Sequence, residues 1–378
     1  MKHYSMLIAL WIFWSCSKDE AGRQDIEGFL LFQDTVLIDP KGDIINLKYG
    51  LSSPELSKDG RFLFHYPDGE HRFNKINLER LELEETLLFE KEGPNGMGGY
   101  IGGFSITQDE HILIWSYGLH AVFSQKGTKL RDLGLSSIAD EFKGYESFPI
   151  RLLEHPNDPT ILFGLMITWQ DYTYTLLKFD LKQKSVERIP LPETERLKSY
   201  HMKIEHEGRP AGGFGATPMA TTIQNDKLII SLLTFNEVYV YDVLVDSLYV
   251  KSWDSQLTGN QNEYKLPKTV QLLQVEEHRK KFFESIVFLD PMWDPVSKRY
   301  IRLSYKSLFA VEPNEDGEYE EIGADVFLTV LDANLDILKE TQLPRLSKNP
   351  RNHFFTDNRI WLFENMDDEL GFIRITVD

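Results

Sequence analysis

A recurring pattern of short strands constrains the fold of this 378-residue chain more than any other feature of its sequence. Six stretches share a polar turn followed by an apolar or alternating run, and each run has the length of a buried strand. Asp, Asn, Gly and Pro in these turns favour tight reversals of the backbone. The six stretches are 58–66, 108–117, 157–167, 225–233, 296–305 and 357–365.

The spacing of the six stretches indicates a loose repeat. Their first apolar residues are Phe62, Ile112, Ile161, Leu228, Tyr300 and Ile360. Successive steps are therefore 50, 49, 67, 72 and 60 residues, and further strand pairs follow, as in 174–191, 238–253 and 326–343. A four-stranded antiparallel unit that recurs about six times is typical of a β-propeller. We expect an all-β, six-bladed propeller; a large sandwich or two adjacent β domains are the alternatives.

The two ends of the chain predict how such a ring closes. The last unit ends with the strand 371–378 and supplies no outer strand. The start, 35–50, has the same order of strand, Asp, turn and strand as 328–343. We therefore expect residues 43–49 to pair with the strand near 371–377, which would remove the exposed edges of an open ring. Separate pairing of Val36–Ile38 is the alternative.

One segment departs from the strand pattern. Residues 265–286 contain good helix formers, with apolar side chains at Val270, Leu273, Phe282 and Phe283. This composition predicts a helix over about 268–282, inserted between the fourth and fifth blades.

The N-terminus indicates export. Lys2 and His3 precede a short apolar run from Met6 to Trp14, which ends just before Ser15 and the single cysteine, Cys16. A basic start, a short apolar run and a small residue are typical of a secretory signal. The run is shorter than the about 20 residues that a membrane-spanning helix needs. An uncleaved helix that contains Cys16 is the alternative.

The segment resembles a bacterial lipoprotein signal, in which the cysteine after the cleavage site is lipidated. The following Lys18, Asp19 and Glu20 resemble the lysine-plus-acid export signal of Bacteroidota lipoproteins. The resemblance implies a lipid anchor on Cys16, a membrane as partner, and the outer face of the outer membrane as location; the periplasmic face is the alternative. We expect a signal peptide over 1–15, a flexible tether over 16–27 and one propeller domain over 28–378.

Net charge excludes one class of partner. The chain carries a formal charge of −18 at pH 7. Nucleic-acid phosphates require a basic surface, so we expect no nucleic-acid partner.

Together with the Cys16 signal and the inserted helix, residues 288–305, with their Trp-Asp turn and Arg-bearing strand, resemble one family. It is the six-bladed, TolB-like propeller lipoproteins of Bacteroidota, which have no assigned function. The resemblance implies the fold and the lipid anchor, and it brings no catalytic residues.

Candidate binding residues lie in connections that a propeller gathers on one face. These connections join an outer strand to the next inner strand, and we call this side the mouth face. They are 93–103, 142–149, 201–215, the helical insert and 344–355. Loops on a rigid scaffold commonly carry function. The candidate ligand-binding residues are Tyr100, His206, Arg209, Arg351 and His353.

No motif in the sequence assigns catalysis, a metal or a cofactor. H-E-x-x-H, a nucleophile elbow, a P-loop and a calcium loop are all absent. We therefore expect a non-catalytic scaffold that binds a protein, peptide or glycan. An envelope hydrolase or lyase that acts on glycan at the propeller mouth is the alternative.

Overall fold

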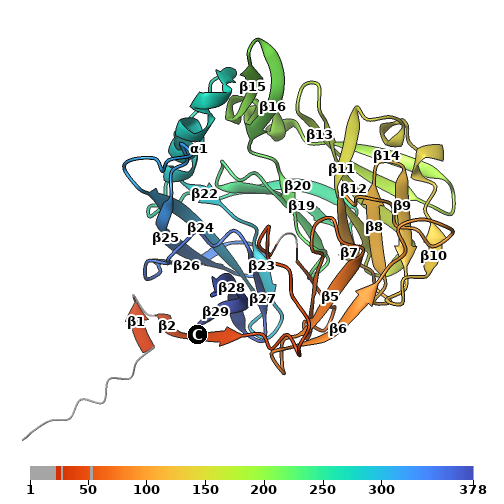
Figure 1. Cartoon of the computed structure of the whole chain (residues 1–378), viewed down its shortest axis with the longest axis horizontal. Coiled ribbons are helices and arrows are strands. Elements are labelled where there is room, and N and C mark those ends of the chain that lie inside the picture. Colours follow the sequence, from red (N-terminus) through yellow and green to blue (C-terminus); the bar gives the residue numbers. More distant parts are fainter. Residues whose placement is uncertain (1–22, 27–28, 52–53, 378) are drawn as a thin grey trace, which may run out of the picture.

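The computed structural model describes residues 23–26, 29–51 and 54–377. Strands make up most of their regular structure, which confirms the all-β expectation. Within the described residues, six sheets contain four or five strands and a seventh contains three. The sheets follow one another around the middle of the molecule (Figure 1). No helix in the described ranges is long and apolar enough to cross a membrane.

The first three sheets follow one another along the chain. The first contains β3 (Glu55–Leu56), β4 (Phe62–His65), β5 (Arg72–Asn77) and β6 (Glu82–Leu88). The second contains β7 (Gly103–Ile106), β8 (Ile112–Ser116), β9 (Leu119–Phe123) and β10 (Lys129–Asp132). The third contains β11 (Ser147–His155), β12 (Asp158–Thr168), β13 (Thr173–Asp180) and β14 (Ser185–Pro190).

Three further sheets follow. The fourth contains β17 (Met219–Ala220), β18 (Lys227–Ser231), β19 (Glu237–Asp242) and β20 (Ser247–Ser252). The fifth contains β22 (Val287–Phe288), β23 (Met292–Asp294), β24 (Arg299–Phe309), β25 (Glu321–Leu331) and β26 (Ile337–Gln342). The sixth contains β27 (His353–Thr356), β28 (Arg359–Met366) and β29 (Glu369–Val377), joined by β1 (Arg23–Ile26) and β2 (Phe29–Leu37).

The repeat found in the sequence corresponds to one strand of each sheet. The six apolar runs form β4, β8, β12, β18, β24 and β28, each of which pairs with the innermost strand of its sheet. All five residues of β8 are buried, whereas β10 and β20 are mostly exposed. Strands buried on both faces need continuous apolar runs, and solvated outer strands do not. This difference explains the pattern seen in the sequence.

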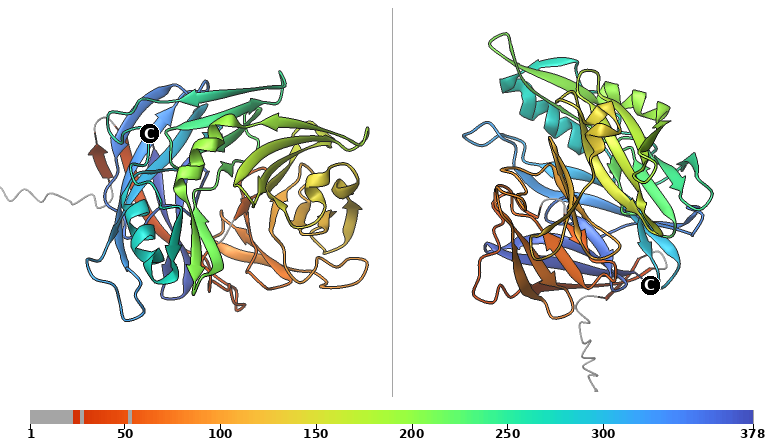
Figure 2. Two further views of the ribbon diagram at one scale, coloured as in Figure 1. Left: turned by 90° about the horizontal axis from the view of Figure 1, so that it is seen from above. Right: turned by 90° about the vertical axis from the view of Figure 1, so that its right-hand side faces the viewer.

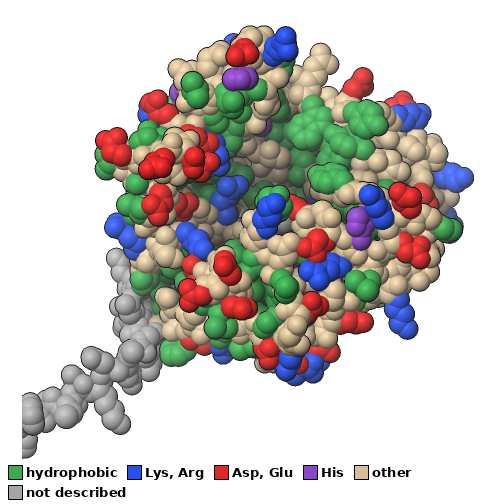
Figure 3. Space-filling view, in the orientation of Figure 1, with side chains coloured by type: hydrophobic (Ala, Val, Ile, Leu, Met, Phe, Trp, Pro, Cys, Tyr) green, Lys and Arg blue, Asp and Glu red, His purple; other side chains and the backbone are tan. Residues whose placement is uncertain are grey.

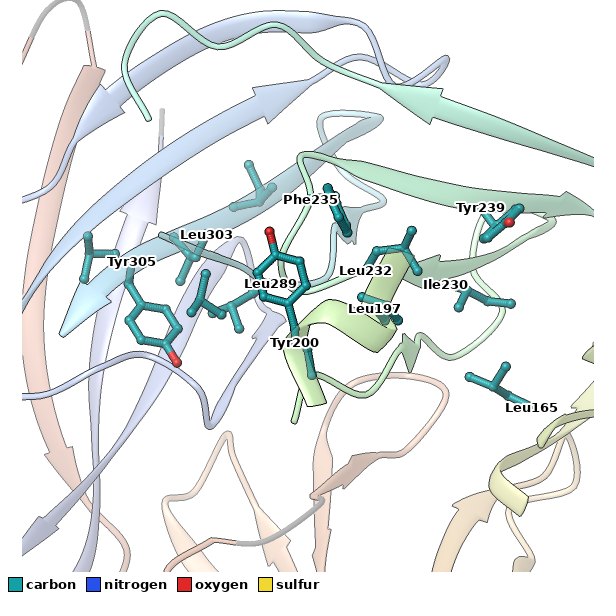
Figure 4. Packing of buried hydrophobic residues seen from close by; sticks show 14 of the residues in the cluster. Leu165, Leu197, Tyr200, Ile230, Leu232, Phe235, Tyr239, Leu289, Leu303 and Tyr305 are labelled. Atoms are coloured by element: carbon teal, nitrogen blue, oxygen red, sulfur yellow. The ribbon is translucent and has the colours of Figure 1, made fainter. Parts of the chain in front are cut away.

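Apolar clusters join neighbouring sheets. Figure 4 shows part of the largest cluster, in which Leu197 and Tyr200 of the 3-10 helix η3 (Pro192–Tyr200) pack among strands of several sheets. Another cluster joins the last sheet to the first, because Trp361 and Phe372 pack with Leu63 and Ile76. The Thr356 hydroxyl also donates to the Gly60 carbonyl over 2.8 Å. The first and last sheets are therefore in direct contact.

The start of the chain joins the last sheet through a different segment from the one predicted. β2 pairs antiparallel with β29, from Leu31 opposite Val377 to Leu37 opposite Gly371. Residues 43–49 form no strand, so the prediction for them was wrong. Asp43 and Asn46 accept hydrogen bonds from nearby backbone N–H groups, which favours turns over a strand.

The three-stranded sheet and the helix form a separate layer, which we call the cap. It consists of β15 (His201–His206), β16 (Arg209–Gly215), β21 (Thr269–Gln271), η4 (Leu272–Gln274) and α1 (Val275–Glu284). The cap projects at the top of the molecule (Figures 1 and 2). Two short 3-10 helices, η1 (Leu135–Ser137) and η2 (Asp140–Phe142), lie elsewhere, before β11.

The cap corrects two sequence predictions. The helix covers Val275–Glu284 rather than 268–282, because 269–271 pair in parallel with β15 and Val270 is buried there. Residues 201–215, which were predicted as a connection between strands, form the hairpin β15–β16. A Cβ on Gly215 would lie 2.0 Å from Nδ1 of His201. The glycine therefore serves close packing.

Candidate functional site

Three connections bring exposed aromatic side chains together. Tyr117 lies in the β8–β9 turn, Tyr145 precedes β11, and Trp169 follows β12. Their exposed fractions are 40%, 75% and 45%. With the partly buried Phe148 of β11, we call this group the aromatic ledge. Figure 3 shows hydrophobic side chains gathered beside a hollow, in the region where β11 and β13 lie in Figure 1.

Direct contacts hold the aromatic ledge together. Trp169 Nε1 donates to the Tyr117 hydroxyl over 3.0 Å. The Tyr117 ring centroid lies 5.0 Å from that of Tyr145 and 4.6 Å from that of Phe148. A Cβ on Gly102 would lie 2.0 Å from the Phe148 ring, so only glycine lets the β6–β7 connection pass beneath it. The ledge is therefore arranged before any ligand arrives.

A strained residue connects the ledge to the cap. Tyr172, three residues after Trp169, has a φ of 54°, a left-handed conformation that costs a non-glycine residue about 1 kcal/mol. Its ring stacks on His201 of β15 at a centroid distance of 4.2 Å and an interplanar angle of 9°. Tyr174 and His201 share a 3.1 Å hydrogen bond between the hydroxyl and Nε2. Burial lowers the pKa of His201 to about 4, so this contact holds a neutral imidazole.

An arginine on β11 joins several inner segments. Arg151 of β11 pairs with Glu55 of β3 through both carboxylate oxygens, with an Nη2–Oε2 distance of 2.9 Å. It also donates to the Thr222 hydroxyl over 3.3 Å and to the Phe104 carbonyl over 3.5 Å. The bidentate contact leaves Glu55 without a free oxygen for acid–base chemistry.

A second buried arginine lies between the fourth and fifth sheets. Arg302 of β24 is 3% exposed, and it donates to the Leu289 carbonyl over 2.9 Å and to Asn236 Oδ1. Its guanidinium lies 4.6 Å from the Trp253 ring centroid. Burial raises the pKa of the nearby Asp290, and Ser231 and Arg302 oppose that shift. These groups are held inside the molecule and do not reach the aromatic ledge through any contact found among the described residues.

The structure divides the five predicted binding residues into three places. Tyr100 is 62% exposed and lies two residues before Gly102, which packs against the Phe148 ring of the ledge. His206 and Arg209 face each other at the exposed tip of the β15–β16 hairpin. The Arg351 guanidinium lies 5.1 Å from the ring centroid of Phe283 in α1. The backbone carbonyl of Arg351 contacts Nδ1 of His353 over 3.4 Å. Of the five residues, Tyr100 is the one that lies within two positions of a residue packed against the ledge.

Two further predictions concern the lipidation and export signal and the binding of a metal. Cys16, Lys18, Asp19 and Glu20 lie outside the described residues. Within the described part of the chain, no three His, Cys, Asp or Glu side chains are grouped to hold a metal.

Tyr117, Tyr145 and Trp169 were not singled out from the sequence. The available signal was their position: each follows or precedes a predicted strand in a turn that contains Gly, Asp or Ser, as in 116–118, 144–147 and 169–172. Aromatic residues are uncommon in turns, which favour small polar residues.

Comparison with known proteins finds one family and several structural relatives. Residues 27–342 match the family model DUF4221, a domain of unknown function. A DUF4221 member from Bacteroides vulgatus aligns with 16% identity and a TM-score of 0.62, covering 93% of this chain and 98% of that one. A Bacteroides fragilis protein named as exported aligns with 7% identity and a TM-score of 0.50, covering 92% and 95%.

A weaker alignment is to the β-propeller domain of Cps50 (Swd1) from Myceliophteria thermophila. It has 9% identity and a TM-score of 0.37, with 85% of this chain and 95% of that one covered. No curated protein matches the sequence. The alignments to the two Bacteroides proteins show a shared fold over nearly the whole chain.

Proposed function

The chain belongs to the DUF4221 family of domains of unknown function, and from this premise we propose that it is an exported, lipid-anchored propeller that binds a glycan. The observation that carries the proposal is the aromatic ledge, in which Tyr117, Tyr145 and Trp169 are exposed and in contact. Exposed apolar groups arranged on rigid turns commonly mark a binding surface.

The chemistry of the ledge suits sugar rings. The faces of aromatic rings pack against the C–H faces of a pyranose, while the Tyr hydroxyls provide hydrogen bonds at the edges. The formal net charge of −18 disfavours acidic polysaccharides. A neutral glycan is therefore the proposed ligand.

The size of the ledge favours a glycan over a protein partner. Aromatic side chains offer about 150–250 Å² each, so exposed fractions of 40%, 75% and 45% leave on the order of 300 Å² in total. A stable protein interface takes about 800 Å² from each partner. The exposed aromatic area instead matches a few sugar units.

We propose a six-bladed ring as the scaffold. Six sheets of four or five strands support it, as do the shared core of the first and last sheets and the pairing of β2 with β29. We also propose that Cys16 carries the lipid and that Lys18, Asp19 and Glu20 direct the protein to the cell surface. The name of the structurally similar Bacteroides fragilis protein, which describes it as an exported protein, is consistent with passage into the envelope.

The catalytic alternative rests on Asp290. Burial raises the pKa of its carboxyl, as in the general acids of some glycosidases. Glycoside hydrolysis normally needs a second carboxylate at a defined distance, and Glu55 is occupied by Arg151. Binding without turnover is therefore the better-supported function.

The test is a binding screen of the purified protein against neutral glycans, acidic glycans and peptides. We expect a neutral glycan to bind, and Trp169→Ala to weaken binding roughly tenfold, because a ring–ligand contact is worth about 1–1.5 kcal/mol. Tyr145→Ala should have a comparable effect. Peptide binding that depends on Trp169 would instead identify a protein partner.

Matched controls separate the ledge from general surface effects. Tyr249 is 40% exposed on β20, like Tyr117, and Tyr49 is 62% exposed near the chain start. Alanine at either position should leave glycan binding unchanged. Glycan turnover by the native protein would favour the enzyme alternative over a binding scaffold.

A further inference from the structure

A pocket lies apart from the aromatic ledge, against the fourth sheet. It has a volume of about 450 Å³ and lies between η3, the start of β19 and the loop that follows β20. Phe235 and Trp253 form its apolar part. Its polar lining consists of Arg196, Asn236, Glu237, Ser252, Asp254 and the pair Asn260 and Gln261. A volume of this size falls in the range of small-ligand sites.

A buried charge fixes two walls of this pocket. Arg302 donates to Asn236 Oδ1, Asn236 Nδ2 donates to the Trp253 carbonyl over 3.2 Å, and Arg302 stacks on the Trp253 ring. Both hydrogen bonds found for the Arg302 side chain among the described residues go to neutral oxygens. Burying a guanidinium without a hydrogen-bonded carboxylate is costly. The arrangement holds the two walls in one geometry, as a preformed site requires.

The loop after β20 is also fixed from within. Asn260 Nδ2 donates to Asp254 Oδ1 over 2.7 Å, and Asn260 Oδ1 accepts from the Ser255 backbone over 3.0 Å. The Asn236 backbone donates to the Asn260 carbonyl over 2.9 Å. These contacts place Asp254 and Asn260 together at the pocket.

Several polar groups remain available to a ligand. In the described part of the chain, the Ser252 hydroxyl and the Gln261 amide have no hydrogen-bond partner, and Asp254 keeps its second oxygen, Oδ2. The available groups are thus a carboxylate acceptor, an amide that both donates and accepts, and a hydroxyl. A ligand with several neighbouring hydroxyl groups satisfies all three, because each hydroxyl both donates and accepts.

The charge of the lining side chains disfavours anions. Arg196 contributes +1 and pairs with Glu237, which contributes −1, and Asp254 adds −1, so the sum is −1. A phosphate or carboxylate ligand would meet repulsion from Asp254. We propose that this pocket binds a small neutral polyhydroxylated ligand, the size of a mono- or disaccharide. The site is independent of the glycan site proposed on the aromatic ledge.

The test uses the purified protein with defined probes. Calorimetry or ligand-observed NMR measures glucose, galactose, N-acetylglucosamine and their disaccharides, with glycine, glutamate and inorganic phosphate as competing classes. We expect a neutral sugar to bind and Asp254→Asn to weaken it roughly tenfold, since a hydrogen bond to a charged group is worth about 1.5 kcal/mol. Gln261→Ala should weaken it by a smaller factor. Melting temperatures of both variants should match that of the native protein.

A cross-control separates the two sites. Tyr145→Ala should reduce glycan binding at the ledge and leave sugar binding in the pocket unchanged, whereas Asp254→Asn should do the reverse. Absence of sugar binding at millimolar concentration, preference for an amino acid or phosphate, or an unchanged affinity in Asp254→Asn would each overturn the pocket proposal. The response of each sugar to Tyr145→Ala distinguishes these results from a failure of the aromatic ledge.

Discussion

The charged side chains of the interior and the aromatic side chains of the mouth face differ in their environment: the charged ones are paired within the protein, whereas the aromatic ones are exposed. Inside, Arg151 pairs with Glu55 and also donates to the Phe104 carbonyl and the Thr222 hydroxyl. At the mouth face, Tyr145 and Trp169 remain exposed although they have apolar area to bury. The Arg151 and Glu55 charges are paired with each other within the protein, whereas the aromatic rings of the rim are left for a ligand. We therefore expect interior substitutions to lower stability and rim substitutions to lower binding.

The largest expected effect is in the interior. Arg151→Ala leaves Glu55 buried without its partner, and breaking a buried ion pair costs about 3–5 kcal/mol. Urea unfolding measures the loss. The double variant Arg151→Met, Glu55→Gln should recover much of it, because no uncompensated charge remains. Lys143→Ala, which removes an exposed ion pair with Asp140, is the control and should change stability little. Equal effects of Arg151→Ala and Lys143→Ala would contradict the comparison.

The next effect is pH dependence at the junction of ledge and cap. The pKa of His201 is about 4 in the folded protein against 6.5 for an unperturbed histidine, because burial disfavours its charge. Between pH 4 and pH 6.5, His201 binds more protons in the unfolded chain than in the folded protein. The contribution of His201 to the free energy of unfolding is therefore fully present above about pH 6.5 and is lost as the pH falls toward 4. The loss from this group is on the order of 3 kcal/mol at most.

Unfolding in urea from pH 7.5 to 4.5 tests this expectation. His201→Gln should flatten the dependence of the unfolding free energy on pH, since the variant cannot take up the proton. Burial lowers the pKa values of His65 and His120 to about 4 as well, so part of the slope should remain. His206→Gln, at the exposed hairpin tip, controls for the substitution. An unchanged slope in His201→Gln would show that His201 does not titrate between the two states.

The smallest effect concerns the fit between cap and ledge. Gly215→Ala places a Cβ 2.0 Å from His201 Nδ1, and overpacking of this kind costs about 2 kcal/mol or less once neighbours shift. Thermal unfolding measures it. Gly99→Ala is the matched control, because its nearest neighbour is the Lys91 side chain at 3.5 Å. A Gly215→Ala protein as stable as Gly99→Ala would mean that the cap packs loosely on Tyr172 and His201.

The strand positions were predictable because a strand that is buried on both faces has a continuous apolar run, and such a run is visible in the local sequence. The second strand of each sheet, such as β8 or β18, is a short apolar run between turn residues. Its position can therefore be found from the residues next to it in the sequence. Pairing between distant segments carries no such signal. Residues 43–49 have the composition of a strand, yet β2 takes the place beside β29, where Asp34 also pairs with Arg374.

The candidate site was harder to predict for the same reason. Arg209 and His206 have chemistry that suggests ligand binding, but they lie opposite each other at the exposed tip of the β15–β16 hairpin. Tyr117, Tyr145 and Trp169 come from three separate connections. Tyr117 and Trp169, which share a hydrogen bond, are 52 residues apart in the sequence. Only the packing of neighbouring sheets brings them together. Of the three connections that carry the site, the sequence indicated 142–149, which contains Tyr145, and tertiary structure adds Tyr117 and Trp169.

The pairing of β2 with β29 also has a consequence for biosynthesis. Asp34 and Arg374 are separated by 340 positions along the chain, so β2 can pair only with β1 until nearly the whole polypeptide has been made. Such a non-local contact forms late and carries a high entropic cost of closure. A ribosome that stalls before residue 369 releases a product in which β2 lacks its partner β29. Completion of synthesis thus becomes a condition for the sheet to form, and incomplete chains offer quality-control proteases an open strand edge.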